Sequence, residues 1–263
     1  DPINEMTVQL WLKYNEDTGA AFIMGQSGWS GQDLHFDISY DADGPKINFI
    51  INGGGNNYSQ YGVVIDDGWH NIAVTYENSN ITFYYDGNHW GSVQNNGSLI
   101  NMNGFRLGNH YNNSRWLYGF LDNYAIWNVA LNQEQIQENM YNDLIGFEDG
   151  LVGYWSFNDG DGDILTDFSG NGNHGTIHGT TWSDDFPQPP HSGPEWFVSE
   201  SGSDENNGSP DYPFATIQHA INSANNGDSV FVGPGTYTEN LDLSGKNVSL
   251  ISTDGPEVTF IDG

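Results

Sequence analysis

Short segments with alternating apolar residues fill the first half of the chain. Between residues 1 and 130, apolar side chains recur at every second position, which is the spacing of a strand with one buried face. Gly- and Asn-rich turns such as Asp86-Gly87-Asn88 separate the segments. The apolar positions of four segments are Val8, Leu10 and Leu12; Ile47, Phe49 and Ile51; Ile72, Val74 and Tyr76; and Ile81, Phe83 and Tyr85. The pattern predicts an all-β sandwich or barrel.

A single helix is predicted at the end of this region. Asn132 can cap its N-terminus, and Gln135 completes a capping box three residues later. Ile136 and Met140 form its apolar side. Strand-like segments resume after it, at 151–157 and 175–182.

A Pro-rich stretch at 186–194 then interrupts the strand pattern. Such a composition is typical of a semi-stiff linker. We therefore predict a first domain at 1–185, a linker at 186–194 and a second domain at 195–263.

The second domain has a different pattern. Apolar residues at helical spacing, from Ile217 to Ala224, predict a short helix that ends at Asn226-Gly227. Short apolar strands are expected after it, at 229–232, 240–243, 248–252 and 258–261. The step from Val230 to Leu250 is about 20 residues, which is the length that one coil of a β-solenoid uses.

Acidic side chains greatly outnumber basic ones. The chain has 35 Asp+Glu against 5 Lys+Arg, a formal net charge of −30. Nucleic acid is excluded as a partner, and an anionic membrane is disfavoured, because both need cationic side chains. No apolar run is long enough to insert into a membrane, and the absence of Cys excludes disulfides and thiolate metal sites. The acids can serve solubility in a salty medium, and some can bind Ca²⁺.

Calcium chemistry is suggested by the segment 167–175. Its sequence, Asp-Phe-Ser-Gly-Asn-Gly-Asn-His-Gly, places oxygen-bearing side chains between glycines, so a tight loop can turn several oxygens toward one point. Ca²⁺ binds about six to eight such oxygens. The alternative is a plain Asn/Gly turn, and the residue types alone do not decide between the two.

Five motifs occur in order over about 180 residues: Thr7–Lys13, Asp67–Tyr76, Phe83–Gly87, Gly119–Ile136 and Gly150–Gly175. In this order they resemble the laminin-G-like family of concanavalin A-type proteins. The resemblance implies an antiparallel jelly-roll β-sandwich. It also implies a Ca²⁺ site that joins the loop at Asp167 to the strand of Asp122, with Asn171 and Asn173 as further ligands.

Aromatic residues in Gly/Asn-rich loops are candidates for carbohydrate binding, because aromatic rings stack on the CH face of a sugar. The candidates are Trp29, Tyr58, Tyr111 and Trp116. The alternative for each is ordinary packing. The Trp residues within strand patterns, Trp11, Trp69, Trp127 and Trp155, are predicted to be core.

The motifs of known catalytic sites are missing from the sequence. Glycoside hydrolases of this fold carry paired carboxylates in a Glu-x-Asp-x-x-Glu motif or a close variant, which this chain lacks. No Ser-His-Asp or zinc-ligand spacing stands out either. We therefore expect no catalysis within these residues, whatever a longer parent protein does.

The second domain carries its own resemblance. The segments Trp196–Gly208, Pro213–Ile221 and Gly227–Glu239 resemble the opening of a pectate-lyase-like, right-handed parallel β-helix, in which a short helix caps the solenoid. That family includes polysaccharide lyases and hydrolases, whose basic or Ca²⁺-dependent sites lie on later coils. Lys246 is the only basic side chain after the linker, so the resemblance implies no such site here.

Taken together, these features favour a non-catalytic, calcium-stabilised carbohydrate-binding or adhesion region of a larger secreted bacterial protein. Two alternatives stay open. One is the N-terminal targeting part of a β-helix polysaccharide lyase or hydrolase. The other is a structural subunit of a cell-surface or extracellular fibre, which would self-associate through the open β-helix end. All three imply an extracellular or cell-surface location.

Overall fold

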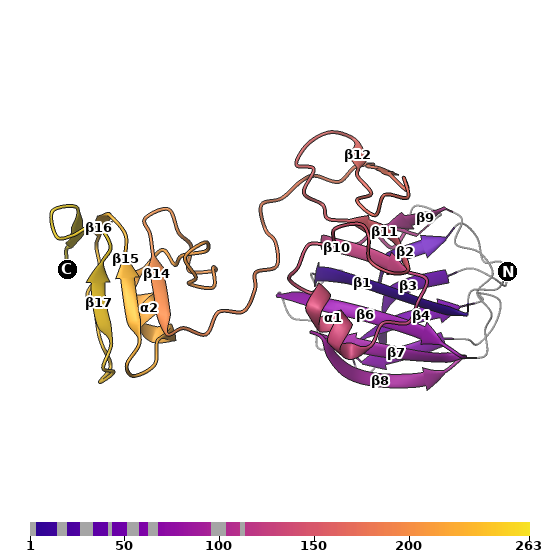
Figure 1. The fold of residues 1–263 in the computed structure, drawn as a ribbon, viewed down its shortest axis with the longest axis horizontal. Helices are drawn as coiled ribbons and strands as arrows, with labels where there is room; N and C mark the ends of the chain where they lie inside the picture. Colours follow the sequence, from indigo (N-terminus) through magenta and orange to yellow (C-terminus); the bar gives the residue numbers. More distant parts are fainter. Residues whose placement is uncertain are drawn as a thin grey trace. The chain divides into compact units, whose positions relative to one another are not determined.

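The computed structural model describes residues 4–14, 20–26, 34–41, 44–51, 58–62, 68–95, 104–110 and 114–263. The chain divides into two compact units, residues 1–187 and 188–263 (Figure 1). The boundary falls inside the Pro-rich stretch, and each unit is described by itself.

The first unit contains two antiparallel sheets (Figure 1). The six-stranded sheet has the order β11-β10-β1-β6-β7-β8 and the five-stranded sheet the order β5-β4-β3-β2-β9. The strands of the first are Glu5–Tyr14 (β1), Trp69–Glu77 (β6), Asn80–Tyr85 (β7), Asn88–Gln94 (β8), Gly119–Trp127 (β10) and Leu151–Trp155 (β11). Those of the second are Ala21–Gln26 (β2), Leu34–Asp41 (β3), Gly44–Ile51 (β4), Tyr58–Gly62 (β5) and Phe105–Leu107 (β9). A short pair, Ile164–Leu165 (β12) and Gly175–Thr176 (β13), follows them.

The core lies between the two sheets and uses the alternating positions of the sequence. Val8, Leu10 and Leu12 of β1 pack in one cluster with Ile47 and Phe49 of β4, and none of the five is more than 2% exposed. Successive side chains of a strand point to opposite faces, so the residues between them face away from this core. The predicted all-β antiparallel sandwich is confirmed.

Helix α1 (Gln133–Asn139) covers part of the outer face of the six-stranded sheet (Figure 1). The Asn132 side chain accepts a hydrogen bond from the Gln135 backbone, and the Gln135 side chain accepts one from the Asn132 backbone. The predicted capping box is therefore confirmed. Beneath the helix, the Trp11 indole N–H donates to the Met140 carbonyl, so Trp11 is buried under α1 and not in the sandwich core.

The second unit is built from parallel strands and one helix. Its elements are Glu195–Val198 (β14), Ile217–Ser223 (α2), Ser229–Val232 (β15), Gly235–Tyr237 (β16), Ser249–Ser252 (β17) and Thr259–Ile261 (β18). Strands β14, β15 and β17 form one parallel sheet, and β16 pairs in parallel with β18. The register places Val230 opposite Leu250, so the 20-residue step is confirmed for this pair.

The strand predicted at 240–243 is wrong. The Asp242 backbone is engaged by the side chain of Gln218, which donates to its carbonyl and accepts from its N–H. These bonds replace a strand partner, and β16 pairs with β18 instead. Among the described residues, no helix is long and apolar enough to cross a membrane.

Charged side chains from the following segment hold both ends of α2. The Glu239 carboxylate accepts the backbone N–H groups of Ile217 and Gln218 at the N-terminal end. The Lys246 ammonium donates to three carbonyls at the C-terminal end, those of Ile221, Asn222 and Ala224. Both contacts satisfy backbone groups that have no partner within a helix, and both complement the helix dipole. Lys246 is thus a structural residue.

Candidate functional site

Polar side chains gather on the face of the five-stranded sheet that points away from the core. His35 and Asp37 alternate with the core-facing residues of β3, so they face outward. Asp37 lies opposite Asn48 of β4, whose amide donates to the Asp37 carboxylate at 2.6 Å. All three residues are nearly fully buried, although they lie outside the core.

Phe22, His110 and Arg115 pack against these residues. The Phe22 ring centroid lies 5.5 Å from that of His35 and 4.5 Å from that of His110. The guanidinium of Arg115 lies 5.6 Å from the centre of the same ring, and the Arg115 carbonyl accepts the Phe22 N–H. The sheet-face cluster is defined by these six residues: Phe22, His35, Asp37, Asn48, His110 and Arg115.

The electrostatics of the sheet-face cluster centre on Asp37. Burial raises its pKa, while the hydrogen bond from Asn48 and the charges of Arg115 and His110 oppose the rise. Hydrogen bonds to a carboxylate held out of water are stronger than those in solvent. Planar polar groups beside an aromatic ring are suited to a ligand with many hydroxyls and an apolar CH face.

The predicted ligand-binding aromatics flank the sheet-face cluster along the chain. Trp116 follows Arg115 directly and is 46% exposed. Trp29, in the connection from β2 to β3, and Tyr111 lie outside the described residues. Tyr58 opens β5, and its side chain is also outside the described part. Their role in binding stays a prediction.

The apolar patterns used for the strands single out none of the six cluster residues. A signal was present in β3, where His35, Asp37 and Ser39 alternate with Leu34, Phe36 and Ile38. Polar residues at every second position lie on one face of a strand. Because all three of these residues can form hydrogen bonds, that face of β3 is a candidate for ligand binding.

The loop between β12 and β13 holds Asp167, a predicted calcium ligand. Its Oδ1 accepts the backbone N–H groups of Tyr154 and Ser169, and its Oδ2 accepts that of Asn173. Burial acts to raise the pKa of Asp167, but hydrogen bonds outweigh it and hold the pKa below the usual value. Asp167 is therefore ionised at neutral pH and organises the loop.

The two asparagines of this loop reach the first residues of β11. The Asn171 amide donates to the Leu151 and Val152 carbonyls, and the Asn173 amide donates to that of Val152. Three oxygens keep lone pairs for a cation, namely Oδ2 of Asp167 and Oδ1 of both asparagines. Carboxylate and amide oxygens are ligands that Ca²⁺ prefers, and calcium binding by this loop stays a prediction.

Asp122 lies on β10 in a separate group of contacts. Burial, with a smaller effect from the charge of Asp143, raises its pKa to about 6, although the Asn123 N–H donates to it. The Tyr154 hydroxyl donates to the side chains of Asn123 and Asp143, while the Tyr154 backbone N–H donates to Asp167. The backbone of Tyr154 thus binds Asp167, while its hydroxyl binds Asn123 and Asp143. A calcium clamp that joins Asp122 to Asp167 stays a prediction. In the part of the chain that is described, no three His, Asp or Glu side chains gather around one point as metal ligands.

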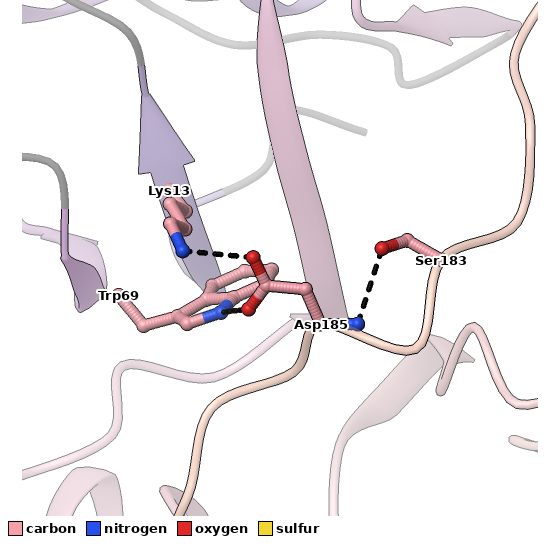
Figure 2. Close-up of polar contacts among 4 residues, drawn as sticks. All are labelled: Lys13, Trp69, Ser183 and Asp185. Atoms are coloured by element: carbon pink, nitrogen blue, oxygen red, sulfur yellow. Dashed lines mark hydrogen bonds and ion pairs between the residues drawn. The ribbon is translucent and has the colours of Figure 1, made fainter. Parts of the chain in front are cut away.

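A third set of polar contacts ties the end of the first unit to the six-stranded sheet. Asp185 accepts hydrogen bonds from Lys13 Nζ and from the Trp69 indole N–H, each at 2.7 Å (Figure 2). Its backbone N–H donates to the Ser183 hydroxyl. Burial is again outweighed by these bonds, which lower the pKa of Asp185. The prediction that Trp69 is core is wrong, because its indole lies partly exposed and binds a carboxylate from a distant segment.

Family comparison agrees with the architecture of the first unit. Residues 1–137, just over half of the chain, match the model of the concanavalin A-like lectin/glucanases superfamily. The chain belongs to this superfamily. Residues 200–244, beyond the superfamily match, fit a family described as a protein of unknown function (DUF1565).

Individual relatives cover parts of the chain. The uncharacterized protein YwoF of Bacillus subtilis is 41% identical over 69 residues, which are 26% of this chain and 14% of YwoF. A crystal structure described as a "putative carbohydrate binding protein" from Bacteroides ovatus has a TM-score of 0.54 at 19% identity, and the match covers 67% of this chain and 55% of that chain. A domain of an extracellular arabinanase from Geobacillus stearothermophilus has a TM-score of 0.42 at 18% identity, covering 52% and 66%. At 19% identity, the Bacteroides ovatus structure shares with this chain the fold alone.

Proposed function

We propose that the chain is a non-catalytic carbohydrate-binding region of a larger secreted bacterial protein, and that the sugar binds at the sheet-face cluster. The observation that carries the proposal is this second, polar face of the five-stranded sheet. A sheet needs only one apolar face to fold, so a buried carboxylate, amide and two imidazoles on the other face need a separate reason. Membership of a superfamily that includes lectins supports the same class of ligand.

Buried and exposed residues of the sheet-face cluster have different roles in the proposed binding. Asp37 and Asn48 form the buried floor, where their hydrogen bond fixes both side chains. Arg115 is exposed and is stacked on Phe22, so its guanidinium is the group that an incoming sugar meets first. Trp116 beside it supplies an exposed ring for the CH face of a pyranose.

A glycan array, followed by calorimetry with the best ligand, tests this proposal. Arg115→Ala and Trp116→Ala should each weaken binding at least tenfold. Phe147→Ala is the matched control, because Phe147 is an exposed aromatic outside the cluster and should not change binding. If no glycan on the array binds, with or without Ca²⁺, the carbohydrate part of the proposal is lost.

Calcium forms the second part of the proposal. Asp167, Asn171 and Asn173 would hold a Ca²⁺ ion at the loop between β12 and β13, where it would stabilise the loop and not touch the sugar. Asp122 is a less direct candidate, because its described hydrogen bond is to Asn123 and not to the loop of Asp167. The charge of Asp143 acts on Asp122 and raises its pKa. A cation there would relieve the repulsion between these two carboxylates.

Thermal unfolding with Ca²⁺ or with EDTA tests the calcium site. The melting temperature of the wild type should rise on adding Ca²⁺, and this rise should vanish in Asp167→Ala but persist in Asp161→Ala, an exposed acid outside the loop. No change on adding or chelating Ca²⁺ would remove the site.

Exposed apolar residues in the second unit support a second candidate. Leu250 and Ile251 of β17 and Phe260 and Ile261 of β18 are 37–52% exposed. We propose that these parallel strands are coils of a β-helix whose next partner is a further strand, either in a polysaccharide lyase or hydrolase or in a fibre subunit. Light scattering over a range of concentrations separates the two, since a strict monomer counts against the fibre.

A further inference from the structure

A row of side chains crosses the outer face of the six-stranded sheet beyond helix α1. In the strand register, Lys13 of β1 lies opposite Trp69 of β6 on one side and Phe120 of β10 on the other. Lys13 alternates with the core residues Leu12 and Tyr14, so all three members of the row face outward.

The rings of Trp69 and Phe120 lie close to each other, although Lys13 separates their strand positions. The centroids of Trp69 and Phe120 are 6.1 Å apart, and Lys13 Nζ lies 6.0 Å from the centre of the Phe120 ring. Tyr118, two residues before Phe120 in the chain and next to the start of β10, has a ring that is 58% exposed, while Phe120 is 39% exposed. The aromatic row is defined as Lys13, Trp69, Tyr118 and Phe120.

Asp185 fixes the polar edge of the aromatic row. Its two carboxylate oxygens bind Lys13 and the Trp69 indole, as Figure 2 shows, so the ammonium and the ring are held in one orientation before any ligand arrives. The side chains of Lys13 and Asp185 remain 30% and 37% exposed, which leaves donors and acceptors facing solvent. A surface that is already ordered loses less conformational entropy when it binds.

We propose that the aromatic row is a second carbohydrate-binding surface and that it takes a neutral polysaccharide. Exposed rings suit the apolar CH face of a pyranose, and the Lys13–Asp185 pair supplies a donor and an acceptor for hydroxyls. The charges of that pair cancel locally, while the chain as a whole carries a formal charge of −30. An anionic chain such as a polyuronate is repelled by that charge, and a neutral one is not.

This second surface would make binding bivalent. It shares its class of ligand with the proposed function but lies on the opposite sheet from the sheet-face cluster. Two surfaces on one domain can engage the same polymer or two neighbouring ones, which raises the overall affinity above that of either surface.

Affinity electrophoresis of the full chain, in gels that contain one polysaccharide each, tests the inference. The neutral probes are barley β-glucan, wheat arabinoxylan, konjac glucomannan and linear arabinan, and the anionic probes are polygalacturonate and alginate. At least one neutral polysaccharide should slow the migration of the wild type through the gel. The substitutions Tyr118→Ala and Phe120→Ala should each reduce the apparent affinity for it at least tenfold. Phe147→Ala should leave it unchanged.

A second measurement guards against variants that fold poorly. The Trp69 indole N–H gives one proton–nitrogen NMR signal, which is assigned by its loss in Trp69→Phe. This signal should shift when the wild type is titrated with the polysaccharide that slows its migration. No retardation by any neutral probe, retardation only by the anionic probes, or unchanged retardation in Tyr118→Ala and Phe120→Ala would each overturn the inference. If retardation is lost in Arg115→Ala alone, the sheet-face cluster is the binding site and only this second surface is refuted.

Discussion

The Asp167 carboxylate should be among the most important side chains for the stability of the first unit. Asp167→Ala removes the acceptor of three backbone N–H groups, two of them buried and one partly buried. Each buried donor left without a partner costs about 1–3 kcal/mol, and water can reach the third. We expect the free energy of unfolding to fall by about 3–5 kcal/mol.

The isosteric change Asp167→Asn separates charge from shape. Its Oδ1 can still accept from Tyr154 and Ser169, but its amide would face the Asn173 N–H, so donor meets donor. We expect a loss of about 2–3 kcal/mol. Because the pKa of Asp167 is lowered on folding, its contribution is complete above the unfolded value of 3.8 and is lost as the pH falls through the folded value. The wild type and the Asn variant should therefore converge in acid.

Urea unfolding in EDTA, followed by tryptophan fluorescence, measures both effects. Every Trp except Trp196 lies in the first unit, so the signal reports on that unit. Asp161→Ala is the control and should change stability by less than about 0.5 kcal/mol, as exposed substitutions usually do. A cost below about 1 kcal/mol for Asp167→Ala, or a difference between wild type and Asp167→Asn that does not shrink in acid, would refute the reasoning.

Two other substitutions test other parts of the chain. Asp122→Asn should raise the free energy of unfolding by up to about 3 kcal/mol in EDTA at pH 7.5, because the folded protein raises the pKa of this carboxyl from 3.8 to about 6 and so disfavours its ionised form. The gain should be complete above pH 6 and vanish as the pH falls toward 3.8; a gain that is the same at pH 4 and pH 7.5 would contradict this. Lys246→Met should cost about 1–3 kcal/mol in the second unit by leaving the α2 carbonyls without their donor. Hydrogen exchange of the α2 amides should then quicken by about tenfold or more, and unchanged exchange would show that Lys246 does not hold the helix.

Local patterns predicted the parts of the fold that depend on neighbouring residues. The alternation of Val8, Leu10 and Leu12 placed them in the core, and the Asn132–Gln135 spacing predicted the cap of α1. Such features are encoded within a few residues, so a single sequence is enough to read them.

Features that depend on distant residues could not be predicted in this way. Asp185 binds Trp69 across 116 positions, and nothing near Trp69 indicates that its indole leaves the core for a carboxylate. The failed strand at 240–243 has the same origin, because its apolar residues suit a strand but Gln218 binds its backbone. The sheet-face cluster could be predicted only in part. Its residues on β3 follow a local pattern, but the approach of Arg115 to Phe22 depends on the fold.

The two charged residues that hold α2 also set an order for the folding of the second unit. A helix of seven residues is too short to be stable alone, and Thr216 is its only local side-chain cap among the described contacts. Its first two N–H groups and its last carbonyls bind Glu239 and Lys246, more than 20 positions later in the chain. During synthesis, α2 should therefore stay unstable until the ribosome has released residue 246, after which helix and strands form together. Glu239 and Lys246 thus couple the folding of α2 to the synthesis of the segment that follows β16.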